Sequence, residues 1–139
     1  MTFQATIETL LQRTGASRTT LRLDRPEGFF PVVAEALAPG IRSIADDTSI
    51  DLGASPTFQS LERERRLLIQ ADLLAADPAP PTELIELYGA RAQMLAPVVR
   101  DDALAGIVSV HYAQGPREWT DDDVAALEEA AAQVLAELG

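Results

Sequence analysis

Apolar residues recur at helical spacing at both ends of the chain. Near the N-terminus they mark one face of an amphipathic helix that ends near Gly15, and they are Phe3, Ile7, Leu10 and Leu11. Near the C-terminus Thr120, with Asp123 three residues later, forms a variant of the capping box. The apolar stripe that follows consists of Val124, Leu127, Ala131, Val134 or Leu135, and Leu138. The sequence therefore predicts one helix at each end.

Between these helices the hydrophobic pattern is that of β-strands. Extended segments are predicted at residues 18–24, 29–37, 66–72, 91–100 and 104–112, with the last two forming an antiparallel hairpin around a tight corner at 101–103. Short helices are predicted at 58–64 and 83–88, and residues 39–56 and 75–81 are predicted to be loops. This order indicates an α+β domain, an α/β sandwich in which terminal helices flank a mainly antiparallel sheet.

The length and the net charge of the chain limit the number of domains and the kinds of binding partner. The 139 residues fit a single domain spanning 1–139, and the net charge of −11 disfavours nucleic acid and anionic membrane surfaces as partners. No apolar run is long enough to span a bilayer, and the first residues lack the features of a signal peptide. We therefore expect a cytoplasmic protein.

The residues that carry most enzyme chemistry are scarce. The chain has no cysteine and no lysine, which excludes disulfides, thiolate nucleophiles and Schiff-base lysines. His111 is the sole histidine, so a metal site with two imidazoles is impossible within one chain. We expect no metal site and no bound cofactor. His111 could be a core histidine with a polar neighbour, a donor to a ligand, or the axial ligand of a haem. An enzyme that uses Arg22, His111 and an Asp is the least favoured class, and we expect no catalytic activity.

The C-terminal half resembles a GAF domain. The resemblance rests on the strand pair at 94–99 and 104–110, on Arg117 and Trp119, and on the helix start at 120–123. It implies a stand-alone sensory domain that binds a small molecule between its sheet and the loops over it, with both terminal helices on the other face. The alternative is a structural dimerisation or signalling module without a ligand. Without cysteine or asparagine, the chain lacks the residues of bilin-binding, methionine sulfoxide-reducing and cyclic-nucleotide-binding members.

Strand alternation indicates a candidate cavity floor. Arg22, Gln70, Ser109 and His111 each lie on the opposite side of their strand from its apolar residues, so they are expected to share one face. Over that face we expect Phe58, Tyr88 and Met94, with Arg91 as a further donor. Guanidinium groups pair well with carboxylates, so the expected ligand is a small organic or aromatic anion. Simple exposure of this face to solvent remains an alternative.

The last helix also carries small residues beside its apolar stripe. They are Ala125, Ala126, Ala132 and Ala136. Small residues allow a second helix to approach closely, so we expect a homodimer through the two terminal helices, as the GAF resemblance also implies. High helix propensity alone is the alternative reason for these alanines.

Overall fold

The predicted strands pair into one antiparallel sheet in the computed structural model, which describes residues 2–139. The strands lie in the order β2-β1-β5-β4-β3. Their bounds are β1 Arg18–Leu23, β2 Val32–Leu37, β3 Leu68–Gln70, β4 Ala92–Arg100 and β5 Ala103–Tyr112. The long β4–β5 hairpin and β1 thus occupy the centre, and β2 and β3 form the edges.

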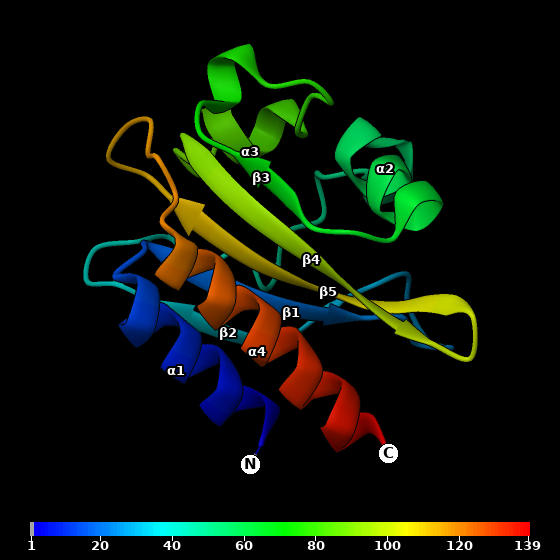
Figure 1. Ribbon diagram of the computed structural model, residues 1–139. Coiled ribbons are helices and arrows are strands. Elements are labelled where there is room, and N and C mark those ends of the chain that lie inside the picture. Colours follow the sequence, from blue (N-terminus) through cyan, green and yellow to red (C-terminus); the bar gives the residue numbers. More distant parts are fainter. Residues whose placement is uncertain (1) are drawn as a thin grey trace.

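Both terminal helices pack on one face of this sheet (Figure 1), which confirms the predicted architecture. Helix α1 spans Phe3–Thr14, and it ends because Gly15 adopts the left-handed conformation at φ 62°. Helix α4 spans Asp121–Leu138, and the predicted capping box between Thr120 and Asp123 is formed in both directions. The capping residues predicted from the sequence therefore define the end of α1 and the start of α4.

The main core lies between these helices and the sheet. It is built from residues that are fully buried: Ile7 and Leu10 of α1, Leu21 of β1, Met94 of β4, Val108 and Val110 of β5, and Leu127 and Val134 of α4. Alternate residues of a strand face opposite sides of a sheet. The residues between these core positions therefore point to the other face.

That other face is covered by short elements. They are the 3-10 helices η1 (Leu52–Ala54) and η2 (Leu73–Ala75), and the helices α2 (Pro56–Glu64) and α3 (Thr82–Glu86). Figure 1 shows α2 and α3 in green above the sheet, on the opposite side from α1 and α4. A second apolar cluster lies under α2, and it includes Phe30, Phe58, Leu61 and Ile107. Within residues 2–139 no helix combines the length and apolar character that crossing a bilayer requires.

Two strands are shorter than the sequence predicts. Strand β2 begins at Val32 rather than at residue 29, because Phe30 has a positive φ of 51° and Pro31 follows it. Strand β3 has only three residues, because Arg65 at φ 55° ends α2 just before it and η2 starts soon after it. The hairpin corner is a two-residue turn at Asp101 and Asp102, both with positive φ, as in a type I′ turn.

Candidate functional site

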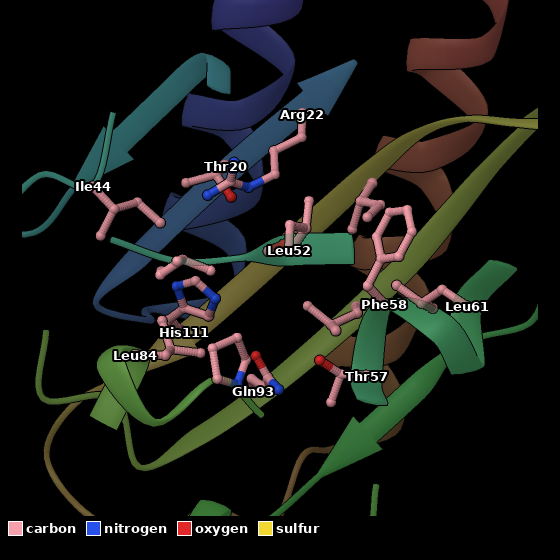
Figure 2. A pocket seen from close by; sticks show the side chains of 15 residues that line it. Thr20, Arg22, Ile44, Leu52, Thr57, Phe58, Leu61, Leu84, Gln93 and His111 are labelled. Atoms are coloured by element: carbon pink, nitrogen blue, oxygen red, sulfur yellow. The ribbon is translucent and has the colours of Figure 1, made fainter. Parts of the chain in front are cut away.

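A cavity lies between the sheet and the segments that cover its second face (Figure 2). The enclosed part of this cavity has a volume of about 50 Å³, and the space widens to about 490 Å³ when the open mouth is included. The floor consists of the polar residues Thr20 and Arg22 from β1, Gln93 from β4, and Ser109 and His111 from β5, with the apolar Leu95 and Ile107 between them. The walls are apolar, and they include Ile44, Ile50, Leu52, Phe58, Leu61 and Leu84.

The pairing of β1 with β5 builds the floor. Thr20 lies directly opposite Ser109 in the ladder, and Arg18 lies opposite His111. Because side chains alternate across a strand, these groups all point away from the terminal helices. The ladder therefore concentrates hydroxyl, guanidinium and imidazole groups on one small area of the sheet.

Several of these floor groups have unused hydrogen-bonding capacity. The Thr20 side chain is buried, with the residue only 1% exposed, yet its Oγ1 has no hydrogen-bond partner within residues 2–139. Ser109 is also buried, and its hydroxyl bonds to none of the described residues. Arg22 makes one side-chain hydrogen bond in this part of the chain, from Nη1 to the carbonyl oxygen of Phe30 at 2.9 Å. A buried polar group without a partner is costly, so this floor is suited to a bound polar molecule.

His111 is held as a neutral ring. Its Nδ1 lies 3.3 Å from Nη1 of Arg18, and the residue is 4% exposed. Burial lowers the pKa of His111 well below its ordinary value, and the positive charges of Arg18 and Arg22 lower it further. The imidazole therefore acts as a neutral hydrogen-bonding group at neutral pH.

Arg18 is a buried residue of this site that the sequence analysis did not name. It is 1% exposed, its Nη2 donates to the carbonyl oxygen of Arg42, and its guanidinium lies 5.5 Å from the ring centre of Tyr88. Burial lowers the pKa of Arg18, while the charge of Glu35 opposes this shift. Among the ion pairs within residues 2–139, none includes Arg18 or Arg22. The positive charge beneath the cavity is thus not neutralised by a direct carboxylate contact.

Polar contacts hold the segment at residues 38–51 over the cavity. The Tyr88 hydroxyl donates to Oδ2 of Asp47, and Oδ1 of Asp47 accepts from the backbone of Ser49 and Ile50 at 2.9 Å. At the other end of this segment, the backbone N–H of Ile44 donates to Glu35 at 2.9 Å. These contacts place the side chains of Ile44 and Ile50 in the cavity wall.

The same contacts shift two pKa values. Burial raises the pKa of Tyr88, and the hydrogen bond to Asp47 raises it further. For Asp47, burial works toward a higher pKa, but the hydrogen bonds from Tyr88, Ile50 and Ser49 outweigh it and lower the pKa. The hydroxyl stays protonated and the carboxylate stays ionised at neutral pH, so this tether persists there.

The structure brings together only part of the expected site. Arg22, Phe58, Ser109 and His111 line the cavity. The other four expected residues, Gln70, Tyr88, Arg91 and Met94, lie outside its lining. Sequence analysis thus found most of the polar floor and one aromatic wall residue.

Three of these four residues make contacts that do not bring them into the cavity lining. Gln70 is on the cavity side of β3, where Gln93 donates to its Oε1 at 2.9 Å and its own Nε2 donates to the carbonyl oxygen of Pro78. Tyr88 tethers the covering segment from outside through Asp47. Arg91 precedes β4, and its backbone N–H donates to the carbonyl oxygen of Tyr112.

Met94 was expected over the cavity floor, but it lies on the opposite face of the sheet, toward the helices. A regular ladder counted from the Asp101-Asp102 turn would pair Met94 with Ser109 and face it into the cavity. A one-residue shift of register between Val98 and Val99 pairs it instead with Val110, on the helix side. One shifted residue reverses every side chain beyond it, so Met94 is a fully buried residue of the main core.

The residues that sequence analysis missed fall into two groups. Arg18 and Thr20 share the parity of Arg22 along β1, so the same alternation could have indicated them. Gln93, Leu95 and the loop residues Ile44, Ile50 and Leu52 carried no comparable signal, because their positions depend on the hairpin register and on the path of a loop. In the part of the chain that the structure describes, no three His, Cys, Asp or Glu residues are grouped to hold a metal ion.

Comparison with known proteins agrees with this architecture. A family model described as the GAF domain matches residues 1–138. A structure of the cyanobacteriochrome receptor PixJ is 27% identical, with a TM-score of 0.75, covering 99% of this chain and 97% of that chain. The blue-light absorbing form of the Thermosynechococcus elongatus PixJ GAF domain is 26% identical, with a TM-score of 0.73, covering 98% and 86%.

A more distant structure shares the fold alone. It is a far-red absorbing dark state with bound biliverdin IXα, 17% identical, with a TM-score of 0.78, covering 98% of this chain and 86% of that one. A comparison with curated proteins gave no match. The match of the family model over residues 1–138, together with the sheet order and the paired terminal helices, shows that the chain belongs to the GAF domain family.

Proposed function

We propose that this GAF domain is a sensory module that binds a small organic anion non-covalently in the cavity over β1 and β5. The observation that carries the proposal is the set of polar groups on the cavity floor that lack partners within residues 2–139, above all Thr20 Oγ1. They lie beneath apolar walls, and a few convergent polar groups among apolar walls are typical of small-molecule sites.

The charges around the cavity favour an anion. Arg22 is in the lining without an ion-pair partner in the described chain, and the lining contains no Asp or Glu. Its guanidinium has further N–H groups besides the one bonded to Phe30, and a carboxylate could accept from them. Phe58 and Leu61 in the wall would then contact an aromatic or aliphatic body.

A covalently attached bilin does not fit this chain. The chain contains no cysteine, so it has no thiol to form a thioether with a tetrapyrrole. The biliverdin in the distantly related structure belongs to that protein. We therefore propose a smaller ligand that is held by hydrogen bonds, charge and apolar contact, and a role in sensing rather than in catalysis.

Ligand-dependent stability tests this proposal. Thermal unfolding would be followed with a series of aromatic and aliphatic carboxylic acids, and native mass spectrometry would detect any co-purified compound. A ligand at one hundred times its Kd stabilises the fold by about 2.7 kcal/mol. Arg22→Met should abolish the shift, whereas the matched charge removal Arg25→Met at an exposed position should retain it. If neither a shift nor a co-purified mass is found, a structural module without a ligand is the better conclusion.

We also propose that the chain forms a homodimer through α1 and α4. Part of the alanine side of α4 already serves the fold, because Ala126 is buried in the main core. The face that remains for a second copy includes Ala132, Ala136 and Leu135, of which Leu135 is 41% exposed. A second α4 could cover this leucine while the two alanines allow close approach.

The molar mass from light scattering distinguishes a dimer from a monomer, and variants of α4 test whether this helix forms the interface. Ala132→Arg places a bulky charge at the proposed contact, so it should convert a dimeric mass to a monomeric one. Gln59→Arg, at an exposed position of α2 on the other face of the sheet, serves as the control and should leave the mass unchanged. A monomeric wild-type protein, or a variant that stays dimeric, would show that α4 is not the interface.

A further inference from the structure

Two series of hydrogen bonds, which we call hydrogen-bond chains, begin outside the cavity. They fix which atoms of the cavity floor donate hydrogen bonds and which accept them. From this geometry, and resting on the proposed anion-binding function, we infer that His111 presents a donor and Gln93 an acceptor to the ligand. The ligand is accordingly a hydroxy acid, with a carboxylate at His111 and a hydroxyl donor at Gln93. Arg18 and Gln70 act as positioning residues behind these two groups.

The first chain runs from Arg18 to His111. Nη1 of Arg18 is 3.3 Å from Nδ1 of His111. An arginine side chain has only donors, so Nδ1 must be the bare nitrogen that accepts. A neutral imidazole carries one proton, which then resides on Nε2. That nitrogen has no partner within residues 2–139, and Figure 2 shows the ring at the cavity floor.

The second chain runs from Pro78 through Gln70 to Gln93. The carbonyl oxygen of Pro78 can only accept, so it fixes Nε2 of Gln70 as the atom that faces it at 2.7 Å. Oε1 of Gln70 must then accept from Nε2 of Gln93, at 2.9 Å. This leaves Oε1 of Gln93 without a partner in the described chain, as an acceptor in the cavity lining.

The two chains meet side by side. Gln93 and His111 are directly opposite each other in the β4–β5 ladder, and Figure 2 shows them at the same end of the floor. A ligand there meets one donor and one acceptor on neighbouring strands. Arg22 adds a positive charge farther along β1, and the hydroxyls of Thr20 and Ser109 can donate or accept. An anionic acceptor next to a hydroxyl donor satisfies both groups, whereas an amine satisfies only Gln93.

The state of the imidazole can be measured without any ligand. His111 is the sole histidine, so the nitrogen NMR signals of the imidazole need no assignment. In the ligand-free protein at pH 7 we expect a protonated Nε2 and a bare Nδ1. Arg18→Lys should keep this tautomer because lysine also only donates, and Arg18→Met should lose the preference. A protonated Nδ1 in the wild-type protein would overturn the inference.

Binding of matched probes tests the ligand class. We expect 3-hydroxybenzoate, whose hydroxyl cannot reach its own carboxylate, to bind about three- to tenfold more tightly than benzoate, the value of one hydrogen bond, and benzylamine to bind more weakly still. Gln93→Leu should bring the ratio of the two affinities, for the hydroxybenzoate and for benzoate, close to one. Tighter binding of benzylamine than of benzoate would overturn the inference but leave small-molecule binding intact. If no probe binds while Nε2 is protonated, the anion-binding function fails and the assigned polarity stands.

Discussion

Replacing Thr20 with valine tests whether the cavity floor is arranged to bind a ligand or to stabilise the fold. Valine has nearly the same shape as threonine but lacks the hydroxyl. Thr20 Oγ1 is buried without a partner in the described chain, and such a group costs about 1–3 kcal/mol. Thr20→Val should therefore raise the free energy of unfolding of the ligand-free protein by about 1 kcal/mol. It should also weaken ligand binding by about three- to tenfold, because one hydrogen bond is lost.

The neighbouring residue supplies a matched control. Thr19 is equally buried on the same strand, but it faces the helices, and its Oγ1 donates to the carbonyl oxygen of Ile7 at 2.8 Å. Thr19→Val removes this bond and should lower the free energy of unfolding by about 1 kcal/mol. The strand propensities of the two residues are the same in both variants, so they cancel in the comparison. The two variants should differ by about 2 kcal/mol.

Urea unfolding at equilibrium measures this difference. With a slope of about 2 kcal/mol per molar urea, the two midpoints should lie about 1 M apart, on opposite sides of the wild-type midpoint. Equal destabilisation by both substitutions would mean that the Thr20 hydroxyl is satisfied within the fold. The Thr20 hydroxyl would then not be a group left free for a ligand, whatever the binding data.

Two further predictions concern the same strands. Burial, with Arg18 and Arg22, holds the pKa of His111 well below 6.5, so on acidification below pH 6.5 the unfolded chain takes up a proton that the folded protein does not. The free energy of unfolding should therefore fall by up to about 1.4 kcal/mol per pH unit, and urea unfolding of His111→Gln should lack this contribution. Gly106→Ala should destabilise the fold by about 1–3 kcal/mol in the same assay, because a Cβ there would lie 2.8 Å from the carbonyl oxygen of Arg22 and 2.7 Å from Leu23. An unchanged midpoint for Gly106→Ala would mean that β1 and β5 can separate without cost.

Much of the site could be predicted from the residues of single strands. Arg22, Ser109 and His111 were predicted to share a face, because the alternation of side chains is a local property of extended backbone. Phe58 was predicted as a wall residue, and α2 does place it there. The apolar residues of the covering segment could not be predicted, because its path depends on contacts such as that between Tyr88 and Asp47, formed by residues far apart in the sequence.

The sequence by itself determined the two terminal helices, the caps at Gly15 and Thr120, and the existence and order of the five strands, because helix caps and side-chain periodicity act over a few neighbouring residues. The tertiary structure alone decided which face Met94 and Gln93 occupy. Periodicity says which residues of β4 lie together, but the register shift at Val98 and Val99 sets their phase relative to β5. The buried contact between Arg18 and His111 depends likewise on the pairing of strands that are distant in sequence, and no local pattern encodes it.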